Sequence, residues 1–363
     1  MSNLPEYFGV EKAGAIRLGK DVVADGTDVA NESTLRIQSH AHSDHLKDYK
    51  HYLNHPRKLI TTEGTKDILL AENRTIKRRI GGRLIVLNTD EARTIDGKKI
   101  ILYDANHMIG SAQTVVEYEN GDRFGYSGDF GWPLDKVLKA DFLVLDSTYS
   151  SFQQGNNQIW NRDTAFRDFG NIILERKKYG PIHIYAHTGV LQECAQYILR
   201  NLNEDFTFFG TEDVIALNSI FSDNGMEQPQ EIKDISKEQY SDYENVVVLR
   251  KYNTRGSSTN FSTILDISNR GASNNSPIKT KSKIDDKIYK AQICITKHAK
   301  GNEVKEYIEK TEAKLVITDS YEIRAGLKKA TELSNDIKKV LGIESFPSHE
   351  LDYWEKSTST YFE

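Results

Sequence analysis

Four side chains of the kinds that bind metals are crowded into the short stretch SHAHSDHL, residues 39–46: His40, His42, Asp44 and His45. The preceding TLRIQ is rich in β-forming residues, and apolar residues recur at helical spacing in the following LKDYKHYL. The cluster is therefore predicted to lie in a turn from a strand to a helix, where several side chains can converge. A solvated histidine-rich turn is the plain alternative. Neutral imidazole nitrogens and carboxylate oxygens suit zinc, with manganese or iron as rivals.

Length and composition set broad limits on the rest of the chain. Its 363 residues are enough for two or three domains, and a net charge of −5 means that nucleic-acid binding would need a local basic patch. The two cysteines, Cys194 and Cys294, lie in apolar runs and are predicted to be buried free thiols. The N-terminus has no signal-like segment and no apolar run reaches membrane-spanning length, so we expect a cytoplasmic protein without a membrane partner.

The pattern of elements changes twice along the chain. Residues 1–150 are β-rich, and Asp-Gly and Asn-Gly turns predict hairpins in TIDGKKIILYDA and TVVEYENGDRFGYSGD. Residues 151–297 alternate between helical and strand patterns, which indicates a separate unit with a small parallel sheet. Within it, RGSSTNFSTILDISNRGASNNSPIKTKSK, residues 255–283, reads as a long surface loop or a basic flap over a polyanion. Residues 298–363 alternate again and complete the chain.

Two further residues extend the opening cluster. His107 follows a β-rich run in ILYDANHMIGSAQ, and Asp129 ends a hairpin strand in GYSGDF. Alone, the histidine would more often be structural and the aspartate a turn former. Together with the cluster they complete a two-metal set. In this set His40, His42 and His107 hold one ion, Asp44 and His45 hold the other, and Asp129 bridges them.

The order HxHxDH, then a later His, then an Asp resembles the metallo-β-lactamase superfamily. DANHMIGSA, YSGDF and LDSTY are similar to its nucleic-acid-processing β-CASP branch, and within it to Artemis/Pso2-like and DNA ligase-associated DNA exonucleases. The resemblance implies an α/β fold: a metallo-β-lactamase αββα sandwich with an inserted β/α cap. The sandwich would comprise residues 1–150 and 298–363, and the cap residues 151–297.

The resemblance also implies roles for residues outside the metal set. Asp146, in DSTY, corresponds to the acidic residue before the cap, and His298 to a histidine that opens a helix after it. An early aspartate that orients the metal ligands would be Asp28 or, as second choice, Asp25. Many relatives carry a further histidine where this chain has Asp319. The Artemis-like members that act on DNA also lack it, which favours DNA. Asp319 could itself be a ligand, or it could cap a helix.

The implied chemistry is hydrolysis of a DNA phosphodiester with two zinc ions, or with manganese or iron, by an exonuclease of DNA repair or processing. The catalytic residues would be Asp44, Asp129, Asp146 and His298. Asp129 would hold the attacking hydroxide, His298 would act as general acid, and Asp146 would orient His298. The predicted phosphate-binding residues are Ser111, Ser147, Thr148 and Asp319. His183 is expected to be packed and His187 to be a candidate cleft residue, whereas the expected surface histidines are His51, His55 and His349.

The alternatives are a β-CASP ribonuclease of the RNase J type and a small-molecule metallo-hydrolase such as a lactonase or thioesterase. A ribonuclease would make RNA the partner instead of DNA, and the missing histidine argues against it. A small-molecule hydrolase would not need the Asp146–His298 pair or so large an insertion. A non-catalytic nucleic-acid-binding relative would be expected to have lost metal ligands, and the HxHxDH motif is complete.

Overall fold

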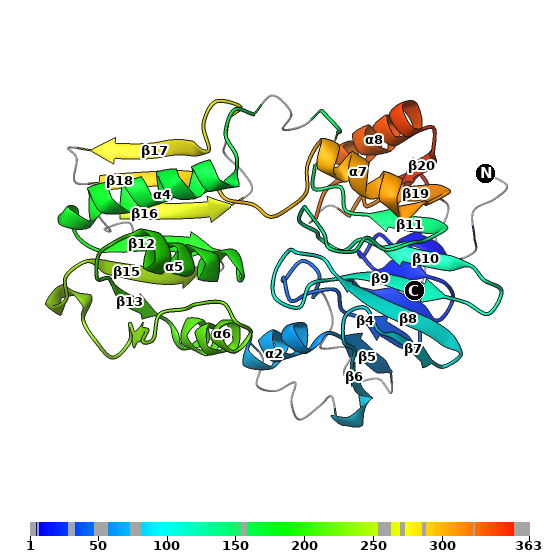
Figure 1. The fold of residues 1–363 in the computed structure, drawn as a ribbon, viewed down its shortest axis with the longest axis horizontal. Helices are drawn as coiled ribbons and strands as arrows, with labels where there is room; N and C mark the ends of the chain where they lie inside the picture. The colour runs from blue at the N-terminus through cyan, green and yellow to red at the C-terminus, as the bar shows by residue number, and fades with distance from the viewer. Residues whose placement is uncertain are drawn as a thin grey trace, which may run out of the picture. The chain divides into compact units, whose positions relative to one another are not determined.

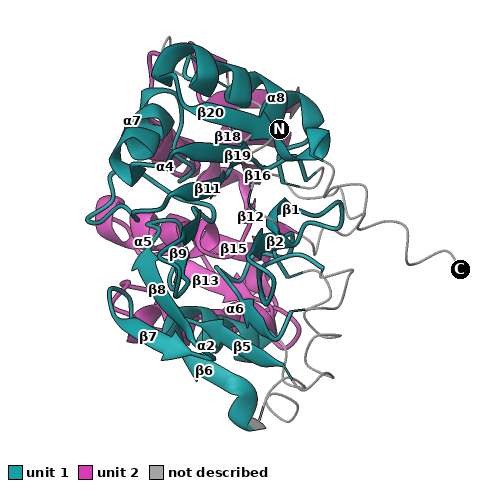
Figure 2. Cartoon of the chain, turned by 90° about the vertical axis from the view of Figure 1, so that its right-hand side faces the viewer, with its two compact units in different colours: residues 1–156, 297–363 teal, residues 157–296 magenta. Residues whose placement is uncertain are grey.

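The computed structural model divides into two compact units, each described here by itself (Figures 1 and 2). Unit 1 comprises residues 1–156 and 297–363, and unit 2 comprises residues 157–296. None of the helices in the described part of the chain has the length and apolarity of a membrane span. The described residues are 5, 7–27, 33–46, 57–72, 81–149, 151–153, 158–252, 263–268, 273–284, 288–321 and 324–351.

The first sheet of unit 1 contains six short strands within the described residues. In sheet order they are β1 (Phe8–Val10), β2 (Ile16–Leu18), β3 (Val22–Ala24), β4 (Leu35–Ile37), β5 (Lys58–Thr61) and β6 (Leu84–Val86). The first three pair antiparallel, and β3 to β6 are parallel. Helix α2 (Glu63–Glu72) follows β5, as the pattern TTEGTKDILLAEN predicts. The predicted helix in LKDYKHYL lies almost wholly outside the described residues.

The second sheet of unit 1 contains the strands whose ends supply most of the candidate site. In sheet order they are β20 (Glu344–Pro347), β19 (Leu315–Thr318), β11 (Phe142–Leu145), β10 (Arg123–Tyr126), β9 (Ala112–Glu117), β8 (Lys98–Asp104) and β7 (Ala92–Ile95). The predicted hairpins are confirmed as β7–β8 and β9–β10. Strands β10, β11, β19 and β20 are parallel, so their carboxyl ends lie along one edge of the sheet.

Successive side chains of a strand point to opposite faces of its sheet, and this alternation explains how the layers of unit 1 pack. Leu35 of the first sheet and Leu102 of the second belong to one buried cluster, so the two sheets pack face to face. Val144 of β11 joins that cluster, whereas its neighbour Leu143 points to the opposite face. There it packs with residues of α7 (Asn302–Thr311) and α8 (Leu327–Asp336), among them Tyr307. The two helices therefore cover the outer face of the second sheet.

Unit 2 is built on a parallel sheet with one antiparallel edge strand. In sheet order its described strands are β14 (Lys233–Asp234), β13 (Thr207–Gly210), β15 (Val246–Lys251), β12 (Ile182–Ala186), β16 (Thr263–Ser268), β18 (Ile288–Cys294) and the antiparallel β17 (Ile278–Ile284). Its helices are α4 (Arg162–Arg176), α5 (Val190–Asn201) and α6 (Glu212–Asp223). The expected α/β class is confirmed. Cys194 and Cys294 are buried free thiols, as expected.

The prediction of one long loop over residues 255–283 is wrong. Residues 263–268 form β16, which pairs with β12 and β18, and residues 278–284 form the edge strand β17. Ser, Asn and Lys make the segment read as a loop. Hydrogen bonding to neighbouring strands nevertheless stabilises the β conformation. Lysines on β17 also suit an edge strand, since they discourage pairing with another chain.

Asp141 ties together the three parallel strands that lead into the candidate site. Its carboxylate binds Arg123 of β10 and Lys314, which precedes β19, and it directly precedes β11. These hydrogen bonds, led by that from Arg123, lower the pKa of Asp141 from 3.8 to about 2. A lowered carboxyl pKa stabilises the fold above about pH 4, and this contribution is lost as the pH falls towards 2.

We therefore expect Asp141→Asn to lower the free energy of unfolding by roughly 1–2 kcal/mol at pH 7, because the neutral amide loses both ion pairs. Urea unfolding of wild type and variant between pH 7 and pH 3 measures the difference, which should shrink as the pH falls. The exposed Asp135, replaced by Asn, serves as the control. A difference that does not depend on pH would contradict this account of Asp141.

Candidate metal centre

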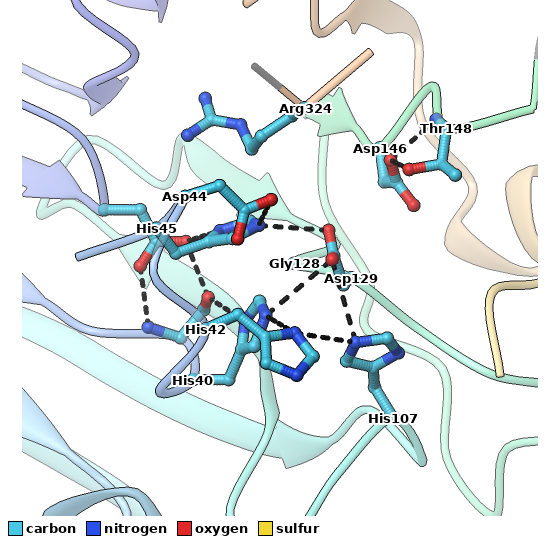
Figure 3. A network of polar contacts seen from close by, with 12 residues as sticks. His40, His42, Asp44, His45, His107, Gly128, Asp129, Asp146, Thr148 and Arg324 are labelled. Carbon is cyan, nitrogen blue, oxygen red and sulfur yellow. Dashed lines mark hydrogen bonds and ion pairs between the residues drawn. The ribbon is translucent and has the colours of Figure 1, made fainter. Parts of the chain in front are cut away.

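Three segments of unit 1 bring the histidines and aspartates together. The segment after β4 carries His40, His42 and His45, the turn between β8 and β9 carries His107, and the turn after β10 carries Asp129. Figure 3 shows these side chains converging on one point from separate elements. The sequence predicts that these residues form one cluster, although they lie up to 89 positions apart. In the described structure their side chains are in contact.

The first group consists of His40, His42, His107 and Asp129, whose donor atoms all lie within 4.8 Å of one another. Nδ1 of His42 lies 3.1 Å from Nε2 of His40 and 3.3 Å from Nε2 of His107. Both Nε2 atoms lie 3.7 Å from Oδ2 of Asp129. Zinc–nitrogen distances of about 2.0–2.1 Å in a tetrahedral site place ligand atoms about 3.3 Å apart. The group therefore fits a metal ion.

The second group is built around His45. Its Nε2 lies 3.3 Å from Oδ1 of Asp129 and 3.9 Å from Oδ2 of Asp44. Within the described residues this buried nitrogen has no hydrogen-bond partner of good geometry, as expected of an atom at a candidate metal position. The two oxygens of Asp129 thus face different groups, so the carboxylate lies between them.

Asp25 orients histidines of both groups. Its Oδ2 accepts from Nδ1 of His45 at 2.7 Å and from the hydroxyl of Ser39 at 2.6 Å, and that hydroxyl lies 2.9 Å from Nδ1 of His40. Because Nδ1 of each imidazole then carries a proton, Nε2 is the nitrogen that each ring directs towards Asp129 and offers to a metal ion. Asp28, the first choice from the sequence, lies outside the described residues.

Ser39 and Tyr126 are contributors that the sequence analysis missed. Ser39 opens the motif SHAHSDHL, and its backbone N–H also donates to Asp25, at 2.9 Å. The Tyr126 hydroxyl donates to Oδ2 of Asp25 at 3.1 Å. Ser39 directly precedes His40, the first residue of HxHxDH, and this position is a sequence signal that could have identified its role. Tyr126 lies 101 residues from Asp25, and its role follows only from the fold.

The two groups differ in the direction in which their surroundings shift the pKa of the histidines. Burial, together with nearby imidazoles, lowers the pKa of His40 and of His107 well below the usual value, so both are neutral. Burial opposes the charged form of His45 too, but the carboxylates of Asp129, Asp44 and Asp25 raise its pKa well above the usual range. Burial disfavours the Asp129 carboxylate, yet His45 and His298 hold the pKa of Asp129 well below the usual value. The carboxylates of the second group therefore favour a positive charge at Nε2 of His45, carried by a proton or by a metal ion that replaces it.

The turn that carries His107 is clamped by the start of α2. The hydroxyls of Thr62 and Thr65 donate to the carbonyl of Gly110 at 2.6 and 2.8 Å. Gly110 has φ +78°, and a Cβ there would lie 2.2 Å from the backbone nitrogen of Thr65, so only glycine fits. Ser111 is buried, and its hydroxyl accepts from the backbone N–H of His107. This geometry gives Ser111 a structural contact and does not support its predicted role in phosphate binding.

Asp146 and His298 lie 152 residues apart in the sequence, and their side chains meet beside the first group. Nδ1 of His298 lies 3.2 Å from Oδ2 of Asp146, and its Nε2 lies 3.7 Å from Oδ2 of Asp129. Burial opposes protonation of His298, but Asp129 and Asp146 raise its pKa to about 9. His298 does not open a helix, as the sequence suggested, because α7 begins at Asn302. It lies in the preceding loop.

Asp319 is held away from the candidate metal positions. Its Oδ2 pairs with Nε of the buried Arg324, and its Oδ1 accepts from the backbone N–H of Tyr321. It belongs to none of the metal-compatible groups among the described residues. It is not a helix cap either, since α8 follows Gly326. The Ser147 hydroxyl is buried and donates to the Asp319 carbonyl, a structural contact that does not support its predicted role in phosphate binding.

The remaining histidines lie apart from the cluster. His183 is buried in β12 as expected, and its Nδ1 accepts from Arg250 at 3.2 Å. The exposed His187 stacks on Tyr252, with ring centroids 5.0 Å apart. His349 is half-buried instead of exposed, because its Nδ1 lies 2.8 Å from the Ser320 hydroxyl. His51 and His55 lie outside the described residues.

The known proteins similar to this chain include one relative and one more distant likeness. No family model matches the chain. The chain is 35% identical over 109 residues to the "Uncharacterized protein in lig 3'region" of Acidianus ambivalens, covering 30% of this chain and 76% of that protein. It therefore belongs to the same family as this protein, whose name states no activity.

The likeness is to "RNase aCSPSF2" of Saccharolobus solfataricus. The two are 27% identical over 164 residues, which cover 38% of this chain and 32% of the RNase. The chain thus spans about a third of the length of this ribonuclease. A distant nuclease relative and a His/Asp cluster that could hold metal ions together suggest a metal-dependent nuclease.

Ser39 provides a test of the metal centre that leaves every candidate ligand intact. Ser39→Ala removes the hydroxyl between Asp25 and His40, so the His40 ring loses the partner that holds its tautomer. We expect zinc affinity to fall roughly 10- to 100-fold, as is typical when the partner of a metal-binding histidine is lost. Competition with a chromophoric chelator measures the affinity. Ser39→Thr retains a hydroxyl and should bind nearly as tightly as wild type, and equal affinities of Ser39→Ala and wild type would contradict the assignment.

Proposed function

We propose that the chain is a metal-dependent phosphodiesterase that acts on DNA, and specifically an exonuclease of DNA repair or processing. In this proposal unit 1 is a metallo-β-lactamase αββα sandwich, and unit 2 is a cap of the β-CASP type. The branch most similar by motif is that of the Artemis/Pso2-like and DNA ligase-associated exonucleases. Zinc is the expected metal, as two ions, with manganese or iron as alternatives.

The observation that carries the proposal is the position of Asp129. One oxygen faces His40, His107 and His298, and the other faces His45. A general acid candidate, the metal-compatible group of His40, His42 and His107, and the group around His45 therefore all contact one carboxylate. This combination suits phosphodiester hydrolysis, because charge builds up on the phosphate oxygens while the leaving oxygen needs a proton.

The bound metal would lower the pKa of the attacking water and neutralise charge on the phosphate. The carboxylates of Asp44 and Asp129 would accept hydrogen bonds from that water and orient it. As its oxygen bonds to phosphorus, the bond from phosphorus to the leaving sugar oxygen breaks. Nε2 of His298 would donate a proton to this oxygen, while Nδ1 stays bound to Asp146. The raised pKa of His298, about 9, keeps it protonated at neutral pH.

Two observations bear on DNA versus RNA. The resemblance places Asp319 where many β-CASP proteins carry a histidine, and in this structure the Asp319 carboxylate pairs with Arg324 instead of facing the candidate metal positions. The relative named for a region next to lig also fits a role on DNA. The second candidate function is a ribonuclease, which the likeness to an RNase favours. A small-molecule hydrolase gains no support from the Asp146–His298 contact.

The test is digestion of end-labelled single- and double-stranded DNA and RNA with zinc, manganese or iron supplied in turn. We expect DNA to be shortened to mononucleotides from one end, and the reaction to stop on chelation. Asp129→Asn should lower the rate at least about 10²-fold, because it removes a charge that faces both metal groups. The exposed Asp223, replaced by Asn, is a charge-matched control that should cleave normally.

Each other outcome has a definite meaning. Cleavage of RNA but not DNA would replace the proposal with the ribonuclease. Cleavage that persists in Asp129→Asn or after chelation would contradict a metal-dependent site at these residues. If no nucleic acid is cut while a lactone or thioester is hydrolysed, the small-molecule hydrolase is correct.

A further inference from the structure

Thr148 makes contacts that distinguish it from a phosphate-binding residue. Its backbone N–H and its hydroxyl both donate to Oδ1 of Asp146, each at 2.8 Å. Thr148 is 7% exposed. Its backbone carbonyl accepts from Nζ of Lys329 of α8, at 2.8 Å, which anchors the turn to unit 1. The hydroxyl proton is therefore committed to the carboxylate.

The two oxygens of Asp146 have separate partners as a result. Oδ1 is occupied by Thr148, so Oδ2 is the oxygen that meets Nδ1 of His298 at 3.2 Å. The backbone N–H of Asp146 donates to the buried hydroxyl of Ser127 at 2.9 Å, which fixes the main chain at the same point. A carboxylate held in this way cannot rotate without losing bonds, because its χ angles are set by both neighbours.

We propose that Thr148 is a positioning residue for the Asp146–His298 pair and not a phosphate-binding residue. This inference rests on the proposed function, because it assigns Thr148 to the delivery of the proton to the leaving oxygen. Without the hydroxyl, Oδ1 loses one of two donors and the carboxylate gains freedom to turn. His298 then loses the fixed partner of its Nδ1, and with it the orientation of its Nε2.

The experiment uses two forms of one oligonucleotide substrate. In the first, the leaving atom at the cleaved linkage is the natural oxygen. In the second it is a bridging sulfur, which departs as a thiolate and does not need a proton. The leaving atom can be on the 3′ or the 5′ side of the phosphate, so a substrate with sulfur at each of these positions is made. Thr148→Val should slow cleavage of the oxygen substrate roughly 10- to 100-fold, the usual cost of losing such an orienting partner. It should slow the matching sulfur substrate less than about threefold.

Three variants serve as references. Thr148→Ser retains the hydroxyl and should restore most of the rate on the oxygen substrate. His298→Ala should show the same dependence on the leaving atom, but with a larger loss. Thr311→Val removes another buried hydroxyl of unit 1, one that donates to the Ile308 carbonyl at the end of α7, and should behave as wild type on both substrates.

The results separate this inference from the proposed function. Equal slowing of both substrates in Thr148→Val, or no slowing of either, would overturn the positioning role while leaving the nuclease intact. A loss in Thr148→Val that the serine variant does not restore would also overturn it. Failure of the wild-type protein to cut either substrate would instead reject the proposed function, and this inference with it.

Discussion

The site depends on one buried carboxylate surrounded by imidazoles. Oδ2 of Asp129 lies 3.7 Å from Nε2 of each of His40, His107 and His298, and Oδ1 lies 3.3 Å from Nε2 of His45. Burying a charge is costly unless it is paired, so this arrangement is stable only with compensating positive charge nearby. Protonated His45 and His298 supply part of that charge, and the geometry of the neutral rings fits a metal ion.

The rest of unit 1 can be understood as support for this carboxylate. The parallel strands β10 and β11 end side by side, which brings Asp129 close to Asp146. The first sheet contributes Asp25, whose oxygens hold His45 directly and His40 through Ser39. The two sheets pack face to face through their apolar residues. The core therefore fixes the relative positions of segments that are far apart in the sequence.

The sequence was most informative where chemistry or turn geometry is local. The density of ligands in SHAHSDHL revealed the cluster, and Asp-Gly and Asn-Gly turns revealed the hairpins. Contacts made by tertiary proximity could not be predicted in the same way. Nothing local shows that Asp319 is engaged by Arg324, or that Asp25 supports two histidines. The strands at 263–268 and 278–284 were missed because their neighbours in the sheet, not their composition, determine the β conformation.

The most direct test of this account is anomalous diffraction from crystals of the protein as purified. The data would be collected at the absorption edge of the metal that elemental analysis finds. A peak is predicted about 2.0–2.2 Å from Nε2 of His40, Nδ1 of His42, Nε2 of His107 and a carboxylate oxygen of Asp129, which are normal distances for zinc with nitrogen and oxygen ligands. An anomalous map with no peak among these atoms, or with metal bound only at the protein surface, would contradict it.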